Sequence, residues 1–234
     1  MQLGLAGRRA VVTGGSKGIG KAIAAELLAE GAAVAICSRH PDELEATAAE
    51  LMKVAADAAT GSVLAMPCDV TDPGQVTAFA DAAAAALGGL DILVNNAGGA
   101  RPGQFATLTD EEWHTDIETK LFSQIRCTRA ALPYLRQSGA PRVININAVY
   151  GRYPDPVFLA SSVNRASCLS LAKALSMDLG REGILVNSVN IGFVTTPQWE
   201  NIHRRRAPTP RPKSFSGNSP PPRCRWAGSG GQTR

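Results

Sequence analysis

The stretch Thr13-Gly14-Gly15-Ser16-Lys17-Gly18-Ile19-Gly20 decides how the rest of the chain can fold. It follows a short β-branched run and precedes an alanine-rich stretch, so it predicts a glycine-rich turn between a strand and a helix. Glycines at such a turn let the backbone approach a diphosphate, and the amino end of the helix favours the phosphate charge. We therefore predict a dinucleotide site here. A plain strand-to-helix turn is the alternative.

Short β-branched runs alternate with longer helical stretches over most of the chain. We expect strands at 10–13, 34–37, 63–67, 92–94, 143–146 and 184–189. We expect helices between them at 19–30, 42–58, 75–87, 110–137 and 158–180. Strict alternation of this kind predicts an α/β fold with a doubly wound parallel sheet that is covered by helices on both faces.

Charge is divided unevenly along the chain. The first 200 residues contain all 20 acidic residues and 16 of the 24 basic ones, whereas residues 201–234 contain eight Arg or Lys and no acid. The second segment is rich in proline and glycine and has no periodicity, so we expect a disordered basic tail after a folded domain at 1–200. Few aromatic residues are interleaved with its cations, and we expect no specific nucleic-acid partner.

The cysteines and histidines indicate neither a disulfide framework nor a metal site. The five cysteines form no C-x-x-C pair, and the three histidines are isolated from one another. No run of about 18 apolar residues is present, and the first residues do not read as a secretion signal. We expect a soluble cytoplasmic protein with buried thiols, no metal and no membrane partner. The cysteines are Cys37, Cys68, Cys127, Cys168 and Cys224.

Two more motifs follow expected strands and lie at the same edge of the sheet. Cys68-Asp69-Val70 follows the third strand and Asn95-Asn96-Ala97-Gly98 follows the fourth. With the glycine-rich turn and Val-Asn-Ser-Val-Asn-Ile-Gly at 186–192, they occur in an order that resembles the short-chain dehydrogenase/reductase family over residues 3 to about 200. The resemblance implies an NAD(P)-binding Rossmann-like domain at 1–200, a three-layer sandwich that lacks the family's last strand.

The resemblance also implies which residues contact the cofactor. They are Gly14, Ser16, Gly18, Ile19 and Gly20 at the pyrophosphate, Asp69 and Val70 at the adenine, and Asn95, Ala97 and Gly98 at the ribose and the sheet centre. Lys17 and Arg39 place two cations where an acid would otherwise bind the adenosine ribose diol, so NADP(H) is favoured over NAD(H). The alternative is that both cations are merely solvated.

The chain departs from the family at the catalytic positions. The family carries an Asn, a Ser and a Tyr-x-x-x-Lys motif, and the matching positions here are Lys120, Ala148, Ser161 and Arg165. A serine hydroxyl is a far weaker acid than a phenol with a pKa of about 10, and arginine, with a pKa above about 12, cannot exchange a proton. The candidate catalytic residues are therefore Lys120, Ser161 and Arg165, in unconventional roles.

Several roles stay open for these side chains. Lys120 is a substitute general acid if burial near Arg165 lowers its pKa. Arg165 can bind the nicotinamide ribose, and Ser161 can orient a substrate. Tyr150 or Tyr153 could also reach the pocket. Against these roles stands a structural interpretation, with Ser161 and Ser162 as helix caps, Lys120 as a solvated residue and the tyrosines as loop packing.

The resemblance implies an NADP(H)-dependent oxidoreductase that acts on a carbonyl or alcohol of a small-molecule substrate, with impaired or unconventional catalysis. A non-catalytic NAD(P)-binding partner of an intact relative and an inactive truncated product are the two alternatives. A homo-oligomer formed through the helices at 110–137 and 158–180 is also implied. The sequence does not predict the identity of the substrate.

Overall fold

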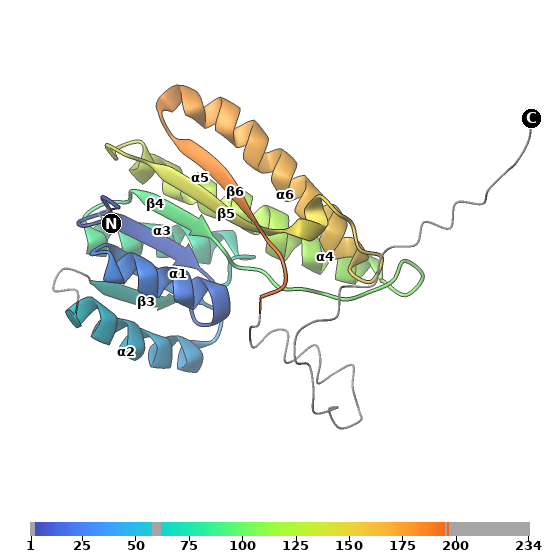
Figure 1. Ribbon diagram of the computed structural model, residues 1–234, viewed down its shortest axis with the longest axis horizontal. Coiled ribbons are helices and arrows are strands. Elements are labelled where there is room, and N and C mark those ends of the chain that lie inside the picture. Colours follow the sequence, from blue (N-terminus) through green and yellow to red (C-terminus); the bar gives the residue numbers. More distant parts are fainter. Residues whose placement is uncertain (1–2, 58–61, 195, 197–234) are drawn as a thin grey trace, which may run out of the picture.

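The computed structural model describes residues 3–57, 62–194 and 196. Six strands form one sheet in the order β3-β2-β1-β4-β5-β6, and every neighbouring pair is parallel (Figure 1). The strands are β1 (Arg9–Thr13), β2 (Ala33–Ser38), β3 (Val63–Pro67), β4 (Ile92–Asn95), β5 (Arg142–Ala148) and β6 (Leu185–Ile191). The prediction of a doubly wound parallel sheet is confirmed, and each strand lies within a few residues of its expected position.

Helices cover both faces of this sheet. They are α1 (Gly18–Ala29), α2 (Pro41–Asp57), α3 (Pro73–Leu87), α4 (Asp110–Ile117), α5 (Ser123–Leu135) and α6 (Leu159–Asp178). Short turns of other helix types are η1 (Glu118–Phe122), η2 (Val149–Gly151) and η3 (Leu179–Glu182). The helix expected at 110–137 is thus interrupted, because η1 is a π-helical turn. The expected tail at 201–234 lies outside the described residues.

Two apolar cores lie on opposite sides of the sheet. Val11, Leu93 and Val143 face the side of α3 and α5, whereas Val12 and Val94 face the side of α1 and α2. Successive residues of a strand point to opposite faces, so these strands are apolar on both faces, as a fully covered parallel sheet requires. The described cysteines, Cys37, Cys68, Cys127 and Cys168, are buried free thiols, as predicted.

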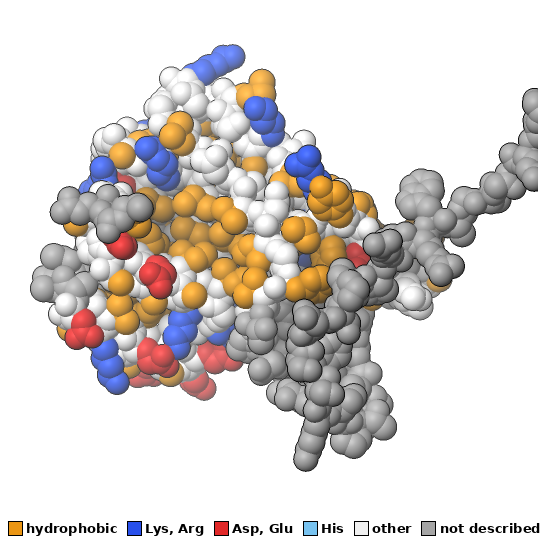
Figure 2. Space-filling view, in the orientation of Figure 1, with side chains coloured by type: hydrophobic (Ala, Val, Ile, Leu, Met, Phe, Trp, Pro, Cys, Tyr) orange, Lys and Arg blue, Asp and Glu red, His pale blue; other side chains and the backbone are white. Residues whose placement is uncertain are grey.

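Strand β6 lies at the edge of the sheet within the described residues. Val186 packs into the core on the side of α5, while Leu185 and Val189 are 48% and 47% exposed. Figure 2 shows the hydrophobic surface that gathers on the molecule beside α1 and α6. None of the described helices has both the length and the hydropathy that a membrane crossing requires.

Candidate active site

A cavity of about 430 Å³ opens at the carboxyl ends of the strands. Its lining comes from the β1–α1 turn, the ends of β2 and β3, the loop after β4, α4 and η1, the loop after β5, and α6. All but one of the residues that the sequence suggested as cofactor contacts line it: Gly14, Ser16, Lys17, Gly18, Ile19, Gly20, Arg39, Asp69, Val70, Ala97 and Gly98. The topology thus brings motifs from distant parts of the chain to one cavity.

The glycine-rich turn has the backbone that a close ligand approach requires. Gly14 and Gly18 have φ angles of 65° and 56°, in the left-handed region that favours glycine. A Cβ atom on Gly20 would overlap the carbonyl group of Gly14, so only glycine lets α1 pack this close to the turn. No side chain caps the amino end of α1. Its first backbone N–H groups are therefore available to an anionic ligand.

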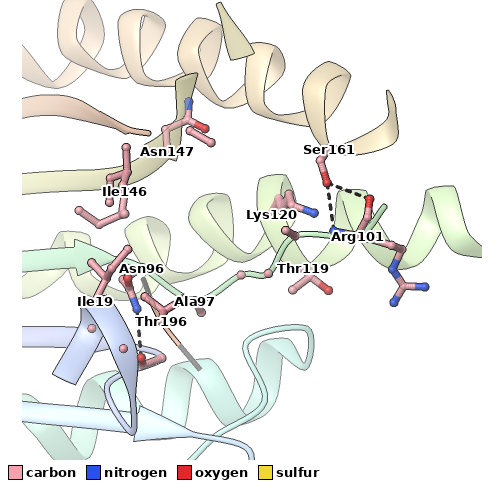
Figure 3. Close-up of a pocket in the computed structure, with 18 of the residues that line it drawn as sticks. Ile19, Asn96, Ala97, Arg101, Thr119, Lys120, Ile146, Asn147, Ser161 and Thr196 are labelled. Atoms are coloured by element: carbon pink, nitrogen blue, oxygen red, sulfur yellow. Dashed lines mark hydrogen bonds between the residues drawn. The ribbon is translucent and has the colours of Figure 1, made fainter. Parts of the chain in front are cut away.

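Asn96 fastens this turn to the loop after β4. Its side-chain amide donates to the carbonyl oxygens of Thr13 and Gly14 at 2.9 and 3.0 Å, as Figure 3 shows in part. In return the Thr13 hydroxyl accepts from the backbone N–H groups of Asn96 and Ala97, both at 3.0 Å. Two of the cavity walls are therefore held at a fixed spacing.

Asn95 lies outside the cavity lining, unlike the other residues suggested as cofactor contacts. Its side chain is buried and donates to Asn145 Oδ1 at 2.8 Å and to Thr128 Oγ1 at 3.2 Å. The direction of the side chain follows from strand alternation, because Leu93 and Asn95 point to the face that α5 covers. Asn95 links β4, β5 and α5 beneath the cavity.

The two cations at the adenosine end have different partners. Both carboxylate oxygens of Glu43 accept from Lys17 Nζ, at 2.8 and 2.9 Å, and this contact lowers the pKa of Glu43. Arg39 has only a distant carboxylate, with Nη1 3.9 Å from Asp69 Oδ2, and its side chain is 57% exposed. The charge of Lys17 is largely neutralised, whereas the guanidinium of Arg39 can bind a ligand.

At the other end of the cavity Lys120 forms a buried ion pair. Its ammonium group contacts Asp116 Oδ1, one helical turn earlier, and both side chains are only 2% exposed. The second oxygen of Asp116 accepts from Asn164 Nδ2 of α6 at 2.9 Å. The solvated lysine of the structural interpretation is therefore wrong. Asp116 and Asn164 were not singled out from the sequence, although the spacing of Asp116 and Lys120 is that of a helical ion pair.

The pKa of Lys120 is lowered to about 8, chiefly by burial. Asp116 opposes this shift and raises the pKa, while the positive charges of Arg165 and Arg101 lower it. A lysine with a pKa of about 8 is mostly protonated at neutral pH and yet releases its proton readily. The condition that the sequence set for Lys120 as an acid, namely burial near Arg165, is thus met.

Arg165, on α6, lines the same cavity as the glycine-rich turn. Its Nη1 donates to the carbonyl oxygen of Ile146 at 2.9 Å, and its Nη2 would lie 3.1 Å from a Cβ atom on Gly98. Asn147 Nδ2 donates to the backbone carbonyl oxygen of Arg165 at 3.0 Å and so fixes this part of α6. A side chain at position 98 would therefore crowd the guanidinium.

Ser161 does not cap α6. Its hydroxyl lies 3.4 Å from the backbone nitrogen and 3.5 Å from the backbone oxygen of Arg101, across the cavity wall (Figure 3). Ser162 likewise bonds to the backbone of Asp155, with its hydroxyl accepting from the N–H group at 3.0 Å. The interpretation of the two serines as helix caps is therefore wrong, because no side chain caps the amino end of α6.

The two tyrosines of the loop after β5 differ in position. Tyr150 lines the cavity and stacks on Phe158 with ring centroids 5.2 Å apart, and Phe193 meets its ring edge-on. Tyr153 is 69% exposed and is not part of the lining. Of the two, only Tyr150 is placed to contact a ligand.

The family model of short chain dehydrogenases matches residues 8–207. The chain belongs to the short-chain dehydrogenase/reductase family. It is 32% identical over 191 residues to D-beta-hydroxybutyrate dehydrogenase of Rhizobium meliloti strain 1021, with 81% of this chain and 72% of the relative covered. The relatives that this chain matches include dehydrogenases and reductases, and this chain is an oxidoreductase.

Two solved structures are similar to this chain. One is an NADPH-bound short chain oxidoreductase from Pseudomonas aeruginosa PAO1 that contains an atypical catalytic center; it is 38% identical, with a TM-score of 0.80 over 84% of this chain and 76% of its own. The other is L-sorbose reductase from Gluconobacter frateurii with NADPH and L-sorbose; it is 30% identical, with a TM-score of 0.83 over 88% of this chain and 77% of its own.

Proposed function

We propose that this oxidoreductase binds NADP(H) in the cavity and reduces a carbonyl group of a small molecule, with Lys120 as the proton donor. The observation that carries the proposal is the buried Lys120, whose pKa of about 8 suits an acid and which lines the same cavity as the glycine-rich turn. The NADPH bound to two similar structures supports the choice of cofactor.

The residues present fit a dinucleotide. The positive φ angles of the turn, the absence of a side chain at Gly20 and the uncapped α1 leave room and N–H donors for a diphosphate. At the adenosine end Arg39 favours a 2′-phosphate, since its nearest carboxylate is 3.9 Å away. Bound NADPH supplies the hydride.

Each candidate catalytic side chain then has a separate task. Lys120 gives its proton to the carbonyl oxygen as the alcohol forms. Arg165 cannot exchange a proton, and it positions the nicotinamide ribose through its remaining N–H groups. The Ser161 hydroxyl is held only at 3.4 and 3.5 Å, so it can turn to donate a hydrogen bond to the substrate oxygen.

The decisive experiment replaces the acid and follows binding and turnover separately. In Lys120→Met we expect NADPH affinity to change little and kcat/KM for a panel of ketones and aldehydes to fall by about 10² to 10⁴. Lys173→Met, at an exposed position of α6, is the matched control and should change neither NADPH affinity nor kcat/KM. Turnover that survives in Lys120→Met would exclude the lysine as the acid.

Cofactor choice is tested on the same protein with Arg39→Ala and Lys17→Ala. We expect Arg39→Ala to weaken binding of NADPH but not of NADH, because only NADPH carries the 2′-phosphate. Lys17→Ala should have a smaller effect, since Glu43 already pairs with this lysine. Equal losses for NADPH and NADH in Arg39→Ala would contradict the assignment.

A non-catalytic nucleotide-binding protein is the second candidate. One observation in its favour is the Lys120–Asp116 ion pair, because the ammonium group already has a partner inside the protein. A second is Ala148, which stands where the family has its serine. Tight NADPH binding without turnover of any carbonyl compound would support this candidate over the first.

A further inference from the structure

The substrate end of the cavity carries an excess of positive charge. Among the described residues, three positively charged side chains line this end, namely Arg101, Lys120 and Arg165. The negatively charged side chain there is Asp116. The remaining charged lining residues lie at the adenosine end, on the turn before α1 and after β2 and β3. A ligand that enters the substrate end therefore meets two net positive charges.

The one carboxylate at this end is already used. Asp116 contacts Lys120 through one oxygen and accepts from Asn164 through the other. Within the described part of the chain, no ion pair includes Arg101 or Arg165, and the nearest acceptor of the Arg165 guanidinium is the neutral carbonyl of Ile146. Burial lowers the pKa of Arg165, because a charge away from water without a counter-ion is costly, so an anion would stabilise this arrangement. Arg101 is partly exposed.

The cofactor does not supply this anion. The diphosphate belongs at the glycine-rich turn, and a nicotinamide ring is positive when oxidised and neutral when reduced. A substrate with a negative charge would supply it.

The positions of the cations suggest how such a substrate lies. In Figure 3 the Lys120 ammonium group is directed toward the Arg101–Ser161 contact, while the Arg101 guanidinium extends away from Ser161. Tyr150, Phe158 and Phe193 supply an aromatic wall to the same cavity. Both residues line the cavity, so a molecule with an oxygen at Lys120 and a charged group at Arg101 would contact the two cations together.

We propose that the substrate is a carbonyl compound with an anionic group, which binds to Arg101 while its carbonyl oxygen faces Lys120. The proposal rests on the proposed function. In the reaction the carbonyl carbon accepts a hydride and its oxygen accepts the Lys120 proton, so that a keto acid becomes a hydroxy acid and NADPH becomes NADP⁺. Positive charge around the oxygen also stabilises the alkoxide that develops there.

The test compares anionic carbonyl compounds with neutral compounds that carry the same carbonyl group. Acetoacetate and methyl acetoacetate are titrated into the full chain by calorimetry, with and without NADPH, and dihydroxyacetone phosphate and dihydroxyacetone form a second pair. We expect the anion of at least one pair to bind about tenfold more tightly or better, as a charged hydrogen bond implies. If the difference in affinity appears in the acetoacetate pair, the anionic group is a carboxylate, and if it appears in the dihydroxyacetone phosphate pair, it is a phosphate.

Arg101→Gln should reduce the affinity for the anion to that of its neutral analogue and leave NADPH binding unchanged. Arg152→Gln is the matched control, because Arg152 is exposed on the loop after β5 and does not line the cavity. Neutral analogues that bind as tightly as both anions, or equal losses in the two variants, would overturn the proposal. Since binding is measured apart from turnover, a protein that fails to bind NADPH or to turn over a ketone would refute only the proposed function.

Discussion

At the scale of single residues, the site is built around one lysine in an unusual environment. Burial lowers the pKa of Lys120 to about 8, and Asp116 keeps it from falling further. Asp116 bonds to Lys120 and Asn164, and we give it the role of a positioning residue. Its removal should therefore change the pH at which the lysine works before it changes cofactor binding.

We expect carbonyl reduction to be nearly constant below about pH 8 and to fall about tenfold per pH unit above it, because only protonated Lys120 can donate. In Asp116→Asn the loss of a negative charge lowers the pKa of Lys120, so the alkaline limb moves to lower pH. The measurement is kcat/KM against pH at saturating NADPH. An alkaline limb at the same pH in wild type and Asp116→Asn would refute the role given to Asp116, and Lys173→Met should leave the limb in place.

The sequence could predict which residues meet at the cavity but not how each is held. The spacing of family motifs identifies the positions of Lys120 and Arg165 directly. Lys120 is buried beside Asp116 of α4, which bonds to Asn164 of α6, and these side chains meet only in the folded chain. The direction of Asn95 could have been predicted from strand alternation, because Leu93 on the same face is a core residue of the α5 side.

At the scale of elements, the β1–α1 turn and the interrupted helix α4–η1–α5 define the two ends of the site. The turn could be predicted because glycine pattern and strand-to-helix change are both local signals. The π-helical turn at η1 could not, since nothing in the residues 118–122 distinguishes it from α-helix. Such turns often occur at functional sites, and this one carries Lys120.

The packing of α1 on the turn predicts a strong effect of Gly20→Ala. The added methyl group would overlap the Gly14 carbonyl, so α1 must move away and the N–H groups of the turn lose their arrangement. We expect NADPH affinity to fall by about tenfold or more, an amount set by the loss of one or two charged hydrogen bonds. Fluorescence titration with NADPH measures it.

Gly180→Ala is the control for this change, because a Cβ atom there would meet nothing within 4 Å. It should bind NADPH like the wild type. If Gly20→Ala also bound NADPH with unchanged affinity, the turn would not be the diphosphate site.

At the scale of the whole molecule, the cavity and a set of stabilising contacts lie at opposite ends of the sheet. The cavity lies at the carboxyl ends of the strands, whereas Asp91 lies just before β4, at the amino ends. Arg9, at the start of β1, donates to both oxygens of Asp91 at 2.9 Å. Ser138, which follows α5, donates to the same carboxylate at 2.5 Å. These contacts link β1, β4 and α5 without reaching the cavity.

Because of these contacts, Asp91→Asn should lower stability and leave NADPH affinity unchanged. Hydrogen bonding to Arg9 is the main cause that lowers the pKa of Asp91 from 3.8 to about 2. A carboxyl whose pKa is lower in the folded state stabilises the protein above the unfolded pKa, and this contribution is lost as pH falls from about 4 towards 2. Allowing for solvent screening, we expect a loss of about 1 to 2 kcal/mol near pH 7. Urea unfolding near pH 7 and near pH 3 should show a smaller difference between variant and wild type at the lower pH, and an equal difference at both would refute the ion pair as its cause.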